Sequence, residues 1–358
     1  LVLGFKELGG WDEMMRVCGA VTVNDYGDTM TNLIRSNDDA NFPWLGALIG
    51  SAIIGFWYWC TDQFIVQRVL SGKNEMEARR GTIFGAYLKL LPVFLFLIPG
   101  MIAFALHQKY IGAGGEGFLP MLANGTANAD AAFPTLVAKL LPAGVKGLVV
   151  CGILAALMSS LASLFNSSAM LFTIDFYKRF RPETPEKKLV GIGQVATVVI
   201  VILGILWIPI MRSVGDVLYT YLQDVQSVLA PGIAAAFLLG ICWKRTSAQG
   251  GMWGLIAGMV IGLTRLGAKV YYSNAGEVAD STFKYLFYDM NWLFFCGWMF
   301  LFCIIVVIVV SLATKAPTAE KIQGLVFGTA TKEQKAATRA SWNHWDIIHT
   351  VIILAITG

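Results

Sequence analysis

Long runs of apolar residues, separated by short polar segments, extend along nearly the whole chain. Residues 190–211 and 292–313 carry no charge at all. At about 1.5 Å of rise per residue, each run is long enough to cross a hydrocarbon core of ~30 Å. The pattern predicts helices over residues 43–66, 83–105, 148–175, 189–211, 217–242, 251–268 and 291–313, with another beginning near 345. The sequence therefore predicts an all-α polytopic membrane protein, with the lipid bilayer as its partner.

Composition and charge agree with this interpretation. Of the 358 residues, 56% are hydrophobic and only 14% are charged, against about 25% in soluble domains. Lys and Arg alternate between the loops: sixteen lie on one side, ten on the other, with Arg265 and Lys269 in the smaller group and Lys89 left inside a helix. The positive-inside rule places the richer side in the cytoplasm. The net charge of +4 thus reflects topology, and no nucleic acid partner is expected.

This topology divides the chain into four segments. Residues 1–41 are expected to be an extracellular loop that follows a helix outside this sequence, and residues 42–314 a transmembrane core of about seven helices. Residues 315–344 form a cytoplasmic loop, and 345–358 begin a last transmembrane helix that is cut short. The six cysteines form no CxxC pair and the three histidines are scattered, so metal catalysis has no support.

The predicted helix 148–175 has one polar face. At ~100° per residue, small and polar side chains share this face: Ala156, Ser159, Ser160, Ser163, Asn166 and Ser167, beside Gly152 and Ala169. Small residues of this kind support close helix packing in membranes. Hydroxyls with a backbone carbonyl also suit a hard cation such as Na⁺. The pattern alone leaves both interpretations open.

The stretch "GFWYWCTDQFIVQRVL", residues 55–70, brings aromatic and polar side chains together. In a continuous helix Tyr58 and Asp62 lie on one face, and Trp59, Gln63 and Gln67 follow the neighbouring one. Rings beside hydrogen-bonding groups suit a sugar, whose C–H faces stack while its hydroxyls need partners. An aromatic belt at the membrane surface is the alternative, but these rings lie far into the predicted helix.

Two further polar groups interrupt apolar helices. Lys89, about two turns into its predicted helix, either snorkels to the surface or donates inward just ahead of Pro92, and we favour the inward donor. In "YTYLQDVQSVLAPG", residues 219–232, Gln223, Asp224 and Gln226 precede a Pro-Gly break. Such residues either bond between helices or form a substrate site of the kind found in secondary transporters.

Several long motifs resemble the sodium/solute symporter family, and within it the sodium–glucose cotransporter branch. They are "WYWCTDQFIVQR", "GAYLKLLPVFLFLIPGM", "GLVVCGILAALMSSLASLFNSSAMLFTIDFYKRF", "YLQDVQSVLAPGIAAAFLLGICWKR" and "EKIQGLVFG". The resemblance covers nearly the whole chain. It implies the family's five-helix inverted-repeat transporter fold, of which this chain holds the second repeat and the helices after it.

The resemblance also implies a substrate site. Tyr58 matches the aromatic inner gate under the sugar, with Trp59 beside it, and Lys89 and Gln223 match partners of the sugar hydroxyls. Gly55 lies at the position where the family's bacterial sugar transporter has a sugar-binding Asn. Glycine has no side chain to form the hydrogen bond that this Asn makes to the sugar.

The family's shared sodium site matches three further residues: the backbone carbonyl of Ala156 and the hydroxyls of Ser159 and Ser160. A Thr–Ser pair that marks family members with a second sodium ion is Ala162-Ser163 here, which implies coupling to one sodium ion.

The expected function is therefore sodium-coupled symport of a sugar, glucose- or galactose-like, across the plasma membrane by alternating access. A sodium-coupled inositol or polyol symporter is the nearest alternative, since inositol carriers share "WYWCTDQ". A sugar-gated sensor or channel on the same scaffold is the next. A membrane enzyme is disfavoured, because the sequence shows no nucleophile–base pair and no metal cluster.

Overall fold

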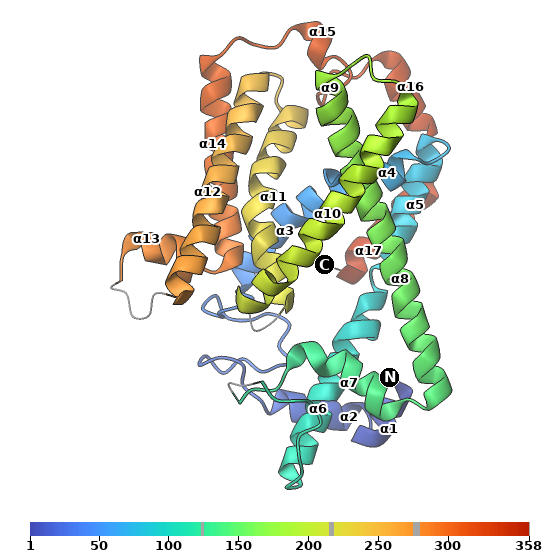
Figure 1. Cartoon of the computed structure of the whole chain (residues 1–358), viewed down its shortest axis with the longest axis vertical. Helices are drawn as coiled ribbons and strands as arrows, with labels where there is room; N and C mark the ends of the chain where they lie inside the picture. Colours follow the sequence, from blue (N-terminus) through green and yellow to red (C-terminus); the bar gives the residue numbers. More distant parts are fainter. Residues whose placement is uncertain (123–124, 215–217, 275–279, 358) are drawn as a thin grey trace. The chain divides into compact units, whose positions relative to one another are not determined.

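The computed structural model describes residues 1–122, 125–214, 218–274 and 280–357. Within these ranges the regular secondary structure is helical, with only two isolated β-bridges, which confirms the all-α fold (Figure 1). Six helical segments among the described residues are long and apolar enough to cross a membrane: Glu75–Gly112, Ala143–Phe180, Glu186–Pro209, Leu218–Cys242, Ala248–Ser273 and Trp292–Ala313. A bent pair, Trp44–Cys60 with Gln63–Leu70, is a seventh candidate.

The chain divides into two compact units. Unit 1 comprises Leu1–Val21 and Pro92–Leu218, and unit 2 comprises Thr22–Leu91 and Tyr219–Gly358. The boundary at Pro92 falls within the long segment Glu75–Gly112, where proline interrupts the backbone hydrogen bonding of a helix. Each unit is described below by itself.

Unit 1 consists of a small helical cluster and a pair of long helices. Its elements are α1 (Val2–Leu8), α2 (Trp11–Gly19), η1 (Val93–Leu97), α6 (Ile98–Gly112), η2 (Ala129–Ala131), α7 (Ala132–Leu140), α8 (Ala143–Met170), η3 (Leu171–Tyr177), α9 (Lys178–Phe180) and α10 (Glu186–Val214). Helices α1, α2 and α7 pack on α6 and bury Leu8, Met14 and Leu106 completely or nearly so. Helix α8, with η3, packs along α10.

Unit 2 is built around α14. Its elements are α3 (Trp44–Cys60), α4 (Gln63–Leu70), α5 (Glu75–Leu88), α11 (Leu218–Cys242), α12 (Ala248–Asn274), α13 (Thr282–Lys284), η4 (Tyr285–Asp289), α14 (Trp292–Ala313), α15 (Ala319–Ile322), α16 (Lys332–Ala340) and α17 (His344–Thr357). Helix α14 packs against both α3 and α12. Glycines allow helices of this unit to approach closely: a Cβ on Gly50 of α3 would lie 2.8 Å from the Leu293 carbonyl oxygen of α14, and one on Gly262 of α12 would lie 2.7 Å from the Val228 carbonyl oxygen of α11.

Two of the predicted helices are wrong in their bounds. The helix expected over 43–66 is broken after Cys60 and resumes at Gln63, with the two parts at 50°. The helix expected over 83–105 begins at Glu75 instead, because Asn74 caps it by accepting the Glu77 backbone N–H at 2.8 Å. The other predicted spans agree with the structure to within several residues, and α17 begins at His344. The predicted loops contain short helices, α1 and α2 before α3, and α15 and α16 after α14.

Candidate functional site

The break between α3 and α4 is built by Asp62. Its carboxylate accepts the backbone N–H of Phe64 at 3.1 Å, which makes Asp62 the N-cap of α4. The Thr61 hydroxyl donates to the Trp57 carbonyl at 2.7 Å and ends α3. The prediction that Tyr58 and Asp62 share one helical face is therefore wrong, because they belong to different helices.

The same break separates the other predicted face. Trp59 lies in the last turn of α3, whereas Gln63 and Gln67 lie on α4. Continuous apolar periodicity hides a break of two residues, and the cap signal of Asp62 was the feature that could have located it.

Lys89 lies against the two aromatic residues at the end of α3. Its Nζ is 4.8 Å from the Trp59 ring centroid and 6.0 Å from that of Tyr58. The two rings meet edge to face, with centroids 5.2 Å apart. Trp59 is 47% exposed, so part of its ring surface is open within this chain. One cation and two aromatic rings, of which Trp59 is exposed and Tyr58 partly buried, thus lie close together, an arrangement that could contact both the apolar face and the hydroxyls of a ligand.

Lys89 is the C-cap residue of α5, fourteen residues after the helix begins. The prediction that it lies two turns into its helix is wrong, since α5 begins at Glu75 rather than near residue 83. The backbone N–H of Lys89 still bonds to the carbonyls of Gly85 and Ala86, both at 3.1 Å. The lysine is therefore fixed to the end of a regular helix, just before the Pro92 interruption.

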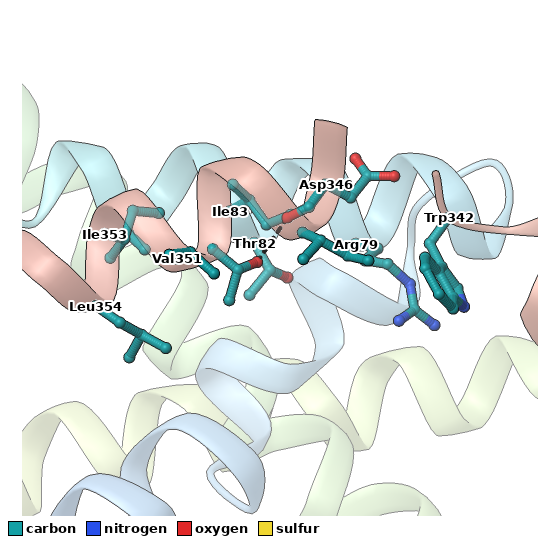
Figure 2. A pocket seen from close by; sticks show the side chains of 11 residues that line it. Arg79, Thr82, Ile83, Trp342, Asp346, Val351, Ile353 and Leu354 are labelled. Carbon is teal, nitrogen blue, oxygen red and sulfur yellow. Dashed lines mark hydrogen bonds between the residues drawn. The ribbon is translucent and has the colours of Figure 1, made fainter. Parts of the chain in front are cut away.

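Helix α17 packs along α5 and restrains the helix that ends in Lys89. The Tyr87 hydroxyl lies 3.0 Å from His349 Nδ1, and Arg80 pairs with Asp346 at 3.4 Å. Figure 2 shows the groove of about 530 Å³ between the two helices, with Trp342 and Asp346 at one end and the aliphatic residues of α17 at the other.

Gln223 lies on α11, where its Nε2 donates to the Tyr219 hydroxyl one turn earlier, at 3.3 Å. No hydrogen bond joins Gln223 to Tyr58, Trp59 or Lys89 among the residues that the structure describes. Lys89, Tyr58 and Trp59 are thus in mutual contact, whereas the side-chain contact of Gln223 that the structure shows is with Tyr219.

Asp224, the neighbour of Gln223, belongs to a buried ion cluster. It accepts hydrogen bonds from Arg265 at 3.2 Å and from Lys269 at 2.6 Å. Arg265 is completely buried, donates to the Met290 carbonyl at 2.8 Å, and lies over the Phe295 ring at 4.1 Å. The cluster therefore ties the first turns of α11 to α12 and α14.

Sequence reasoning missed this cluster. Arg265 and Lys269 were grouped with the charges of the external side, whereas both lie within α12, four residues apart. Ionisable residues inside an apolar segment nearly always have a charged or polar partner. Asp224, in the preceding apolar segment, was the acid that could have been matched to them.

The predicted sodium residues lie on α8, in unit 1. Ala156, Ser159 and Ser160 are all exposed within this chain, and neither serine hydroxyl has a hydrogen-bond partner among the described residues. Further along, the Ser163 hydroxyl donates to the Ser159 carbonyl at 3.1 Å, and Ser167 donates to the Ser163 carbonyl at 2.8 Å. The unpaired oxygens at Ser159 and Ser160 are neutral, which suits a monovalent cation better than a divalent one.

A strongly charged metal centre is not seen in the described part of the chain. No group of three or more His, Cys, Asp or Glu side chains there is placed to hold a metal ion. The described cysteines are all free, and none lies in a disulfide.

Comparison with known proteins identifies the family. The model of the sodium:solute symporter family matches residues 1–258. Sodium/myo-inositol cotransporter 2 of Homo sapiens is 38% identical over 300 residues, 83% of this chain and 44% of the relative. A sodium/mannose cotransporter of Bos taurus is 36% identical over 343 residues, 93% and 58% of the two chains. Sodium/glucose cotransporter 1 of Ovis aries is 36% identical over 327 residues, 87% and 49%.

A solved structure of a Na⁺-coupled sialic acid symporter, in a substrate-bound outward-open state, has a similar fold. Its TM-score is 0.61 at 19% identity, with 88% of this chain and 60% of that chain covered. The present chain spans about half the length of the curated relatives named above, 44 to 58%. The match of the family model over most of the chain, together with six membrane-spanning candidates, leads to one conclusion. The chain is a membrane protein of the sodium:solute symporter family.

Proposed function

We propose that this chain carries the sugar-contacting and sodium-binding helices of a sodium-coupled symporter that moves a sugar or polyol across the plasma membrane by alternating access. The observation that carries the proposal is the convergence of Lys89 with Tyr58 and Trp59. The sodium-coupled sugar and inositol carriers among the relatives support it. In this proposal the protein is not an enzyme, and the substrate leaves chemically unchanged.

The aromatic pair and Lys89 have complementary tasks in sugar binding. Tyr58 acts as the inner gate whose ring stacks under the apolar C–H face of the substrate, with Trp59 beside it. The Lys89 ammonium donates hydrogen bonds to substrate hydroxyls, and its contact with Trp59 holds it near the rings beforehand. Gln223 is the fourth contact, its amide released from Tyr219 to bond to a hydroxyl.

Sodium is the second transported species. The carbonyl of Ala156 and the hydroxyls of Ser159 and Ser160 supply three neutral oxygens on one face of α8. A hard cation is bound by several oxygen ligands at once. A bound sodium ion therefore needs oxygens in addition to these three. These three oxygens alone would bind sodium weakly. If the remaining ligands are in place only when substrate is bound, the binding of substrate and the binding of sodium strengthen each other.

We place residues 42–314 in the membrane as the transporter core, with residues 1–41 outside the cell. Residues 315–344 form a cytoplasmic loop, and residues 345–357 begin a further transmembrane helix; Gly358 lies outside the described residues. This orientation rests on the excess of Lys and Arg in the loops on the cytoplasmic side. The five-helix inverted-repeat fold is part of the same proposal.

Two alternatives differ in a measurable way. A sodium-coupled inositol or polyol symporter is favoured by the 38% identity to a myo-inositol cotransporter. A sugar-gated sensor or channel would bind substrate without accumulating it.

Counterflow with the complete protein in proteoliposomes separates these functions. Vesicles loaded with unlabelled glucose, galactose, mannose or myo-inositol are diluted into trace labelled substrate. Transient accumulation of one label supports a carrier for that substrate, whereas binding without accumulation of any label supports the sensor and contradicts symport.

A further inference from the structure

A cavity with four polar side chains in a largely apolar lining lies in unit 1 between the C-terminal half of α8, η3 and the first turns of α10. Its volume is about 340 Å³, and its polar lining consists of Asn166, Thr173, Gln194 and Thr197. No charged residue lines it. Because α8, η3 and α10 pack against one another inside this unit (Figure 1), the cavity is part of one compact body.

The Thr173 hydroxyl in this cavity has no partner within the described chain. Thr173 is only 5% exposed, and its Oγ1 makes no hydrogen bond there. A buried hydroxyl without a partner loses its bonds to water and gains nothing in return. By contrast, the Thr197 hydroxyl across the cavity donates to the Gly193 carbonyl at 3.0 Å. The oxygen of Thr173 is therefore available to a ligand that the chain does not provide.

Local geometry explains why Thr173 is unpaired. Ser and Thr side chains in α-helices commonly bond to the carbonyl four residues earlier, as Ser163 and Ser167 do on this helix. Thr173 lies in η3, where the backbone changes from α-helical to π-helical hydrogen bonding. Such π-helical segments occur frequently at functional sites.

The cavity continues the face that carries the proposed sodium ligands. Ser159 and Asn166 are seven residues apart and share one side of α8 at ~100° per residue. Thr173, in η3, lines the same cavity as Asn166. Asn166 lies about 10 Å from Ser159 along the helix axis at ~1.5 Å per residue. An ion that leaves Ser159 and Ser160 and moves along α8 toward Lys178 and Arg179 thus meets Asn166 and then the Thr173 hydroxyl.

We propose that this cavity is a second, weak binding position for Na⁺, where the partly hydrated ion is held by Thr173 and the neighbouring amides between the α8 serines and the cytoplasm. The inference rests on the proposed function, because it takes Na⁺ as the transported ion. Uncharged oxygen ligands supply no countercharge, so they hold a cation weakly. Weak binding is what an ion in passage requires.

Thr173→Val in the complete protein tests this inference, because valine has nearly the shape of threonine and lacks only the unpaired hydroxyl. The thermal midpoint in detergent should stay unchanged or rise. The maximal rates of sodium-driven substrate uptake and of labelled-sodium exchange should fall about fivefold or more, the effect of losing one buried polar contact. Thr173→Ser keeps the hydroxyl and should retain most of the rate.

Thr264→Val serves as the matched control, because the Thr264 hydroxyl already donates to the Val260 carbonyl of its own helix at 2.8 Å. It should leave both rates unchanged. Wild-type rates in Thr173→Val overturn the inference. Equal losses of rate in the Val and Ser variants also overturn it, as does a loss of rate accompanied by a lower thermal midpoint, because both results indicate that the substitution disturbs packing. If the unchanged protein shows no sodium dependence, the proposed function fails as well; sodium dependence with normal rates in Thr173→Val rejects the inference alone.

Discussion

Replacing Lys89 by methionine separates a substrate ligand from a lysine that only reaches the membrane surface. Methionine keeps an unbranched side chain but removes the ammonium that lies 4.8 Å from the Trp59 ring centroid. Lys89 is exposed within this chain, so the lost cation–π contact should cost about 0.5–1 kcal/mol of stability. A hydrogen bond from a charged group to a buried hydroxyl contributes about 1.5–3 kcal/mol, which corresponds to roughly 10- to 150-fold in affinity.

The assay is equilibrium binding of labelled sugar, or half-saturation of counterflow, beside thermal unfolding of the same preparations. We expect a large loss of affinity with a small change in thermal midpoint. Lys73→Met is the matched control, since Lys73 is also exposed and follows α4 in the loop before α5. Wild-type affinity for the sugar in Lys89→Met would refute the role of Lys89 as a substrate ligand. It would support the alternative that the lysine side chain only reaches the membrane surface. Equal losses in both variants would indicate a general effect of positive charge.

Three further results are expected. Asp224→Asn leaves the fully buried Arg265 without its charged partner and should lower the free energy of unfolding by about 3 kcal/mol or more, measured by denaturant or thermal unfolding in detergent. Asp280→Asn, which removes an exposed carboxylate from its pair with Lys284, should leave that free energy nearly unchanged in the same measurement. Burial opposes the ionisation of Asp39, but hydrogen bonds from the backbone N–H groups of residues 41 and 42 outweigh the effect of burial and lower the pKa of this carboxyl. The ionised Asp39 therefore stabilises the loop above the unfolded pKa of about 3.9, and this stabilisation is lost as pH falls through the lower folded pKa. Hydrogen exchange of residues 22–42 should increase as pH falls through that range, and Asp39→Asn should remove this pH dependence. Because Ala162 offers no hydroxyl, uptake should depend hyperbolically on sodium with a charge-to-sugar ratio near one, and a sigmoidal dependence with a ratio near two contradicts the single-ion prediction.

Helix type and approximate position followed from the sequence because apolar runs of membrane length admit few other structures. The run before Thr314 is such a case: it predicted a helix over 291–313, and α14 spans Trp292–Ala313. The apolar runs did not predict where a helix is interrupted. Thr61 and Asp62 interrupt an otherwise apolar segment by a local cap, and such a cap changes the hydropathy of the segment very little.

The candidate site was predictable in its residue types and less so in its geometry. Lys89 was expected near the aromatic residues and does lie on Trp59, but from the end of α5 rather than from its interior. The partners of Asp224 were not predicted, because the pairing joins α11 to α12 across residues that are 41 and 45 positions apart. Periodicity within one helix carries no information about such contacts between helices.

Sodium coupling is tested by the initial uptake of labelled substrate driven by an inward sodium gradient, in proteoliposomes of the complete protein, with the unchanged protein compared with Ser160→Ala. The Ser160 hydroxyl has no hydrogen-bond partner among the described residues, so its loss should leave the fold intact and weaken the dependence on sodium. We expect uptake that requires sodium in the unchanged protein and a higher half-saturating sodium concentration in the variant. Uptake that persists unchanged in sodium-free buffer, or that protons support fully, would contradict it.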